Sequence, residues 1–239
     1  SLRLNIEMKK LLSVVFLSLF YITGLQAAGI NMGVSLSGGV FEVDGASEEF
    51  KAGHVSNNSS SAAVSKKHSS EGDAAEGAFA IGSIFVEKTL GDRFAIGIDY
   101  VPQSIDSETS ENVQQDGPGE PNGTNVTNTV QADFQDLTTI YAIASADNGV
   151  YVKFGLMSVD VKTNENLATG GAYGDTSLDG TMVGIGYARD LDNGTFFRVE
   201  GNMMDLDGVT LTNTADSNKS VKVDGISGYG ARISVGKSF

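Results

Sequence analysis

The stretch Gly228–Phe239, GYGARISVGKSF, alternates residue by residue between two chemical characters. Every second residue counted back from the end belongs to a mostly apolar set: Phe239, Lys237, Val235, Ile233, Ala231 and Tyr229. The residues between them are small, polar or charged: Ser238, Gly236, Ser234, Arg232 and Gly230. A period of two predicts a β-strand with one apolar and one polar face, and here the pattern continues to the last residue.

This ending resembles the last strand of bacterial outer-membrane β-barrels, in which a terminal Phe serves as a recognition signal for the barrel-assembly machinery. The resemblance assigns that role to Tyr229, Ile233, Val235 and Phe239. Lys237 departs from the pattern, because those proteins usually carry a hydrophobic or aromatic residue there. A lysine near the membrane rim can extend its amine to the headgroups. The resemblance implies a signal peptide, an even number of strands, and alternating short and long connections.

The beginning of the chain predicts export. Residues 1–7 have no structural logic of their own and are interpreted as an upstream leader. Residues 8–27 combine a basic start, an apolar run over Leu11–Leu25 and a small-residue cleavage site, which together predict a signal peptide. The apolar run is shorter than the roughly 20 residues that a spanning helix needs. We therefore expect residues 28–239 to form the mature domain, with strands making any membrane contact.

Composition narrows the class of protein further. The chain has 239 residues and no cysteine, so one domain without disulfides is expected. The formal net charge of -14 argues against nucleic acid as a partner. Short Asp-rich segments at 190–194 and 205–208 lack the glutamate that a calcium loop requires, and we predict neither a metal site nor a cofactor.

Period-two patterns predict eight strands separated by turn-forming or polar segments. The predicted strands cover 28–44, 76–90, 94–102, 133–146, 150–163, a segment around 182–188, a segment around 196–203, and 221–239. Long connections at 46–75, 103–132, 164–178 and 205–220 alternate with short turns at 90–92, 147–149 and 190–194. This alternation is typical of an up-and-down antiparallel transmembrane barrel with long extracellular loops, short periplasmic turns and both termini in the periplasm.

Two details of the strands are less regular. A bulge or kink is expected at Gly38–Gly39, after which Phe41 and Val43 would continue the apolar outer face of the first strand. The orientation of the strand at 76–90 stays open, because apolar residues occur on both of its faces.

Charged residues on the predicted strands fix which face points inward. A charge at mid-bilayer on such a barrel costs roughly 2–4 kcal/mol, whereas a soluble lipocalin-like barrel would be apolar inside and polar outside. We therefore predict that five charged residues line the lumen and neutralise one another: Asp99, Lys153, Arg198, Glu200 and Arg232. Because eight strands enclose little more than their own side chains, these residues are expected to plug the lumen. Glycines on the same faces leave some room: Gly97, Gly155, Gly184 and Gly186.

The pattern covers nearly the whole mature chain and resembles the small eight-stranded barrels of the OmpA-like and opacity-type family. OmpA-type proteins that anchor the envelope carry a peptidoglycan-binding domain after the barrel, and the sequence ends at Phe239 without one. Tethering to the cell wall is therefore not expected. The expected location is the outer membrane, with its lipid and lipopolysaccharide as partners.

Three functions remain open at this level: a structural or surface-interaction barrel with acidic loops, a narrow pore for small solutes or ions, and an outer-membrane enzyme. The first is favoured because the lumen is expected to be filled. The enzyme is disfavoured because His54 and His68 lie in a Ser-rich segment predicted to be mobile, which does not preorganise a catalytic site.

Overall fold

The computed structural model describes residues 29–51, 64–67, 75–107, 109–115 and 125–239. Predictions for the leader at 1–7, the signal peptide at 8–27, and His54 and His68 lie outside these residues. Among the described residues, none of the helical segments has the length and apolar character needed to span a bilayer.

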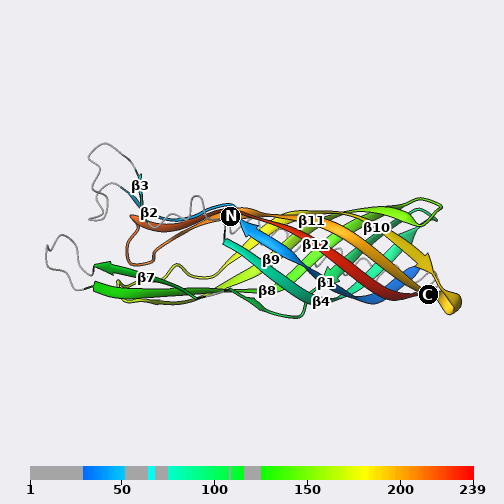
Figure 1. Ribbon diagram of the computed structural model, residues 1–239, viewed down its shortest axis with the longest axis horizontal. Helices are drawn as coiled ribbons and strands as arrows, with labels where there is room; N and C mark the ends of the chain where they lie inside the picture. Colours follow the sequence, from blue (N-terminus) through cyan, green and yellow to red (C-terminus); the bar gives the residue numbers. More distant parts are fainter. Residues whose placement is uncertain (1–28, 52–63, 68–74, 108, 116–124) are drawn as a thin grey trace.

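Eight strands of the described chain close into an antiparallel barrel (Figure 1). In order around the wall they are β1 (Ile30–Val43), β4 (Ala75–Leu90), β5 (Phe94–Tyr100), β8 (Asn125–Ser145), β9 (Val150–Leu167), β10 (Thr176–Asp190), β11 (Thr195–Thr212) and β12 (Lys219–Ser238). The last of them pairs with β11 on one side and with β1 on the other, so the sheet has no free edge at this seam. The predicted eight-stranded barrel is confirmed.

The seam between β1 and β12 extends to the end of the chain. Phe239 N–H donates to the carbonyl of Ile30 at 2.8 Å, and Gly29 N–H donates to the carbonyl of Phe239 at 2.7 Å. Inside the seam, the ring of Phe85 lies where a side chain on Gly33 would project. Any larger residue at that position would overlap the ring and the neighbouring backbone, which explains glycine there.

Short turns join strands at the periplasmic end, where the C-terminus lies (Figure 1). In the turn at 147–149, Gly149 N–H donates to the carbonyl of Ala146 at 3.0 Å, and Ala146 N–H donates to that of Val150 at 2.8 Å. Gly149 has a φ of 88°. The predicted hairpin is therefore confirmed, as a three-residue loop with glycine in the left-handed position.

The opposite, extracellular end is more ordered than predicted. The expected loops at 46–75 and 103–132 contain four further strands: β2 (Ala46–Lys51), β3 (Val64–Lys67), β6 (Ile105–Asp106) and β7 (Ser110–Gln115). β2 pairs with β12 and β3 with β2, while β6 and β7 pair with β8. In Figure 1 they form two arms beyond the barrel. The predicted loops at 164–178 and 205–220 are also shorter, because β9, β10, β11 and β12 continue into them.

Strand pairing explains these corrections. Antiparallel backbones exchange hydrogen bonds whatever their side chains, so a hairpin can continue past the membrane with polar residues on both faces. Such residues lack the apolar alternation from which strands are predicted, and their composition therefore indicated loops.

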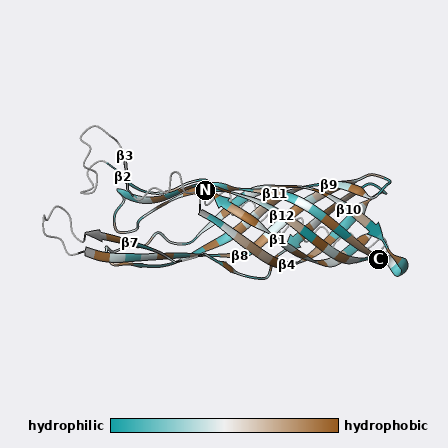
Figure 2. Ribbon diagram, viewed as in Figure 1, coloured by the Kyte–Doolittle hydropathy of each residue, from teal (hydrophilic) through white to brown (hydrophobic). Residues whose placement is uncertain are grey.

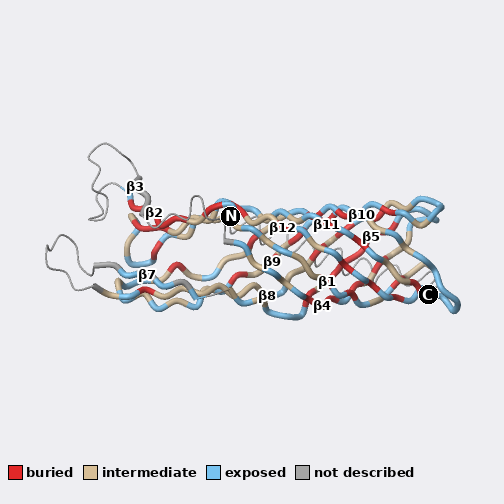
Figure 3. Tube along the Cα trace, in the orientation of Figure 1, coloured by how far each residue is buried: buried red, intermediate tan, exposed pale blue. Residues whose placement is uncertain are grey.

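The barrel strands alternate between lipid-facing and interior residues, as the burial pattern in Figure 3 and the hydropathy pattern in Figure 2 show. Large apolar side chains are exposed along the outer wall, among them Met32, Val34, Leu36, Val40, Ile84, Phe154, Ile185, Met203, Tyr229 and Ile233. A belt of this kind suits hydrocarbon rather than water.

Two strands differ from the detailed predictions. β1 is continuous, with uninterrupted pairing through Gly38 and Gly39, so the expected bulge is absent. Val40 keeps the outer register and the ring of Phe41 instead covers Gly77 across the sheet. For β4, the open orientation is resolved: Ile81, Phe85 and other odd-numbered residues are buried inside, whereas Ile84 is exposed on the outer wall. Apolar residues occur on both faces of this strand, so hydropathy alone does not distinguish its inner face.

β5 is the shortest strand of the wall. Its pairing with β4 ends at the pair Ile84–Tyr100, so residues 75–83 of β4 pair with β1 but with no strand on their other side within the described chain. Gln103, which follows β5, accepts a hydrogen bond at Oε1 from the backbone N–H of Gly82 at 3.0 Å. A side chain thus takes the place of a strand at this point of the wall.

Candidate functional site: the barrel interior

The five charged residues predicted to line the lumen all have inward-facing side chains. Asp99, Lys153, Glu200 and Arg232 are buried, and the Arg198 side chain is 14% exposed. They come from β5, β9, β11 and β12, so the closure of the barrel brings together residues far apart in sequence. Each has an oppositely charged neighbour.

The first ion pair joins Arg198 to Glu87 of β4, which is 0% exposed. The two terminal guanidinium nitrogens, Nη1 and Nη2, both donate to the carboxylate, and the Nη2–Oε2 distance is 2.8 Å. Tyr141 Oη donates to the same carboxylate at 2.8 Å, and Asn31 Nδ2 donates at 3.2 Å. The guanidinium carbon also lies 4.6 Å from the ring centroid of Phe196. Bidentate geometry and full hydrogen bonding are the conditions under which a buried pair is tolerated.

The second ion pair joins Lys153 to Glu200, with 3.6 Å between Nζ and Oε2. Tyr151 Oη donates to Glu200 Oε2 at 3.0 Å, and Asn202 Nδ2 donates to its Oε1 at 3.3 Å. The Lys153 ammonium lies 4.1 Å from the ring centroid of Tyr141. Tyr141 therefore contacts both pairs, and so does Tyr151, whose ring centroid lies 5.7 Å from the guanidinium carbon of Arg198.

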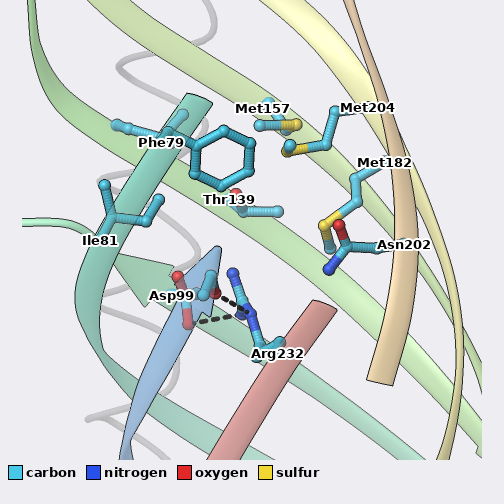
Figure 4. A pocket seen from close by; sticks show the side chains of 11 residues that line it. Phe79, Ile81, Asp99, Thr139, Met157, Met182, Asn202, Met204 and Arg232 are labelled. Atoms are coloured by element: carbon cyan, nitrogen blue, oxygen red, sulfur yellow. Dashed lines mark hydrogen bonds and ion pairs between the residues drawn. The ribbon is translucent and has the colours of Figure 1, made fainter. Parts of the chain in front are cut away.

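The third ion pair is seen in Figure 4, where Asp99 of β5 faces Arg232 of β12. Arg232 Nη1 donates to Asp99 Oδ2 at 2.9 Å, and its Nε donates to Ser37 Oγ at 2.9 Å. Ser83 Oγ donates to the same aspartate oxygen at 2.9 Å. We call the six residues of the three pairs the charge network: Glu87, Asp99, Lys153, Arg198, Glu200 and Arg232.

Within the described chain, this network has three acids and three bases, so its charges cancel. Glu87, its most buried member, was missed by the sequence analysis because the orientation of β4 was left open. The signal existed: Glu87 shares its face with Phe85, and a glutamate on a barrel strand marks the inner face of that strand.

A second, apolar set of side chains fills the lumen on the extracellular side of the network. Four of these side chains, Phe79, Met157, Met182 and Met204, lie next to the charge network and are seen above the Asp99–Arg232 pair in Figure 4. We call the whole set the apolar layer: Phe79, Leu137, Met157, Val159, Val161, Leu178, Met182, Met204, Leu206, Val209 and Ile226. A cavity of about 10 Å³ lies between the network and this layer, about the space that one water molecule needs. The prediction of a polar interior therefore holds only for the periplasmic half.

The glycines that the sequence suggested would leave room are covered by neighbouring side chains. The rings of Tyr141 and Tyr151 lie over Gly97 and Gly186, and Glu200 lies over Gly184. Glycine here admits large side chains from adjacent strands instead of leaving open space.

Outside the barrel, a buried ion pair joins the extracellular strands. Lys219 Nζ of β12 lies 3.1 Å from Glu48 Oε1 of β2, and it also donates to Thr169 Oγ1 at 3.1 Å. Tyr173 Oη donates to Glu48 at 3.4 Å. Burial, reinforced by the Glu48 charge, raises the pKa of Tyr173 above its usual range. The β9–β10 connection is thereby held against β2 and β12.

The residues proposed as an assembly signal lie on the outer face of β12 and at the residue that follows it. Tyr229, Ile233, Val235 and Phe239 are exposed to the membrane side of the wall. The Lys237 ammonium lies 5.7 Å from the ring centroid of Phe239. Among the described residues, no group of acidic or histidine side chains has the arrangement of a metal site.

These features define the class: an eight-stranded transmembrane β-barrel with an apolar wall and a filled interior. No protein-family model matches the chain, and no curated protein sequence matches it.

Similar solved structures are outer-membrane proteins. OprG of Pseudomonas aeruginosa is 12% identical, with a TM-score of 0.42 over 87% of this chain and 96% of that one. Ail of Yersinia pestis, solved with the heparin analogue sucrose octasulfate, is 9% identical, with a TM-score of 0.34 over 86% and 99%. The outer-membrane protease OmpT of Escherichia coli is 10% identical, with a TM-score of 0.34 over 88% and 97%. Likeness at this level does not assign an activity.

Proposed function

We propose that this protein is an outer-membrane barrel with a structural or surface-interaction role, whose lumen does not conduct. The observation that supports it best is the filling of the interior. Every charged side chain of the network has an oppositely charged partner, and the layer above contains only apolar groups. A narrow pore is the competing function, since six ionisable groups line the periplasmic half of the lumen.

The role at the surface is supported by the extracellular strands. Four strands beyond the barrel and the buried Glu48–Lys219 pair hold part of the long connections in fixed positions. An ordered surface can present side chains to a partner at lower entropic cost than mobile loops. The proposal includes no catalytic role, because the interior carboxylates are engaged by donors and bases.

The proposal also includes two sets of partners. Outer-membrane lipid and lipopolysaccharide would contact the apolar wall. The barrel-assembly machinery would read Tyr229, Ile233, Val235 and Phe239 before the seam closes.

The conduction part is tested in planar bilayers with protein purified from the outer membranes of an expressing Gram-negative host. Folding is checked by heat-modifiable mobility on gels. We expect a folded protein that shows no discrete openings. Stable openings whose size changes in Arg198→Ala would instead support the pore.

Location and orientation are tested with single cysteines, since the chain has none of its own. Ser217 is exposed between β11 and β12, and Asn148 is exposed in a turn at the other end. We expect a membrane-impermeant maleimide to label Ser217→Cys on intact cells and to label Asn148→Cys only after lysis. The reverse pattern, or no labelling of either variant after lysis, would refute the proposed topology.

A further inference from the structure

The interior has two chemically different layers in series along the barrel axis. Toward the periplasm lies the charge network, and toward the outside lies the apolar layer, with the boundary between Arg232 and Met204 visible in Figure 4. An ion that crossed the barrel would have to pass both. The two layers differ in how strongly they oppose a hydrated ion.

The charge network is a poor barrier to a hydrated ion once one of its members is lost. Its groups are hydrogen-bond donors and acceptors, so water entering the vacated volume would find partners among Tyr151, Asn202 and the remaining charges. A polar, roomy site is the kind that buried water occupies.

The side chains of the apolar layer offer no such partners, although Thr139 and Asn202 line the cavity beside them. Met182, which is 1% exposed, and Met204 are direct neighbours on β10 and β11. Val159 pairs with Leu178, and Leu206 pairs with Ile226. Val159, Leu178, Leu206 and Ile226 pack into one cluster with residues of β8. One of those β8 residues, Leu137, also lines the cavity beside Met182 and Met204. A hydrophobic constriction excludes water, and an ion entering it must give up its hydration shell without replacement.

We infer that the apolar layer, rather than the charge network, is the barrier that keeps this barrel from conducting. The inference rests on the proposed filled lumen and identifies which part of the filling blocks ions. Losing an ion pair would cost stability yet leave the barrel silent, whereas making the apolar layer polar would open it.

The test compares conductance of full-length protein purified from outer membranes, with variants of matched size. Met182→Ser/Met204→Ser makes the layer polar and smaller, and Met182→Ala/Met204→Ala makes it equally smaller without polarity. Glu200→Ala removes a charge and volume from the network. Met203→Ser repeats the same chemical change one residue away, on the outer wall, where Met203 is 57% exposed.

We expect discrete openings in the double-serine variant, and none in the wild type, Glu200→Ala or Met203→Ser. The double-alanine variant should open far less often than the double-serine variant. The inference is overturned if Glu200→Ala conducts at least as well as the double-serine variant, or if serine and alanine conduct equally. If the double variant does not fold, as judged by gel mobility, the single Met204→Ser and Met204→Ala variants decide in the same way.

A conducting wild type would refute the filled lumen of the proposed function. It would refute this inference as well, whereas a non-conducting wild type together with a non-conducting double-serine variant would refute the inference alone. The two failures are therefore distinguishable.

Discussion

Replacing Arg198 by methionine should reveal how strongly the interior depends on the Glu87–Arg198 pair. The substitution keeps most of the side-chain volume but removes two charge-assisted hydrogen bonds. Glu87, at 0% exposed, would keep only the donors of Tyr141 and Asn31. Breaking one partner of a buried pair costs roughly 3–5 kcal/mol, because the other charge remains buried. We expect the free energy of unfolding to fall by about that amount.

The partner substitution supplies the decisive control. Replacing a buried pair by uncharged groups of similar volume is often neutral. Glu87→Gln/Arg198→Met should therefore be more stable than Arg198→Met alone, with a coupling of about 0.5–3 kcal/mol. The exposed Arg93–Asp147 pair, at 2.8 Å with side chains 62% and 81% exposed, gives a surface comparison. Arg93→Ala should cost less than about 1 kcal/mol.

The assay is equilibrium unfolding by guanidinium in detergent micelles, followed by circular dichroism and by gel mobility of unheated samples. If Arg198→Met costs less than about 1 kcal/mol, as a surface pair does, the reasoning about buried charge is wrong. The same conclusion follows if the two single substitutions add without coupling.

Three further outcomes are expected. Gly186→Ala should lower the folded fraction because a methyl group there would overlap a tyrosine ring, while Gly201→Ala, with open space around it, should not; gel mobility measures both. Because the pKa of Tyr173 is raised in the folded protein, its hydroxyl increases the free energy of unfolding. This contribution is fully present below the ordinary tyrosine pKa of about 10 and declines as pH rises above it. Tyr173→Phe should lose that part of the pH dependence of unfolding. Phe239→Ser should reduce the folded protein recovered from outer membranes, whereas Leu191→Ser, in a periplasmic turn, should leave it unchanged.

Much of the barrel could be predicted from sequence because the membrane imposes a strict alternation on lipid-facing strands. The inward faces of β9 and β11 followed directly from Lys153, Arg198 and Glu200, since a charge has only one acceptable side. β4 lacked such a signal over most of its length. Glu87 marks its inner face near one end, and the pairing with β1 and β5 agrees with that orientation.

Other parts of the fold could not be predicted, for physical reasons. β2 and β7 lie beyond the apolar wall, where neither face has to contact lipid, so their sequences need not show the alternation from which strands are predicted. The apolar layer was missed because Phe79 and the methionines interrupt the rule that apolar residues face lipid. Only the cross-strand register shows that they fill the interior together.

The closure of the wall by its first and last strands has a consequence for the order of events during biogenesis. β12 gives β1 its second partner, so a chain lacking only this strand has two bare edges and an interior open to one side. No part of the wall can close into a barrel before β12 is present. Synthesis of the whole chain must precede completion of any of it, and until then an escort has to keep both edges from pairing with other molecules.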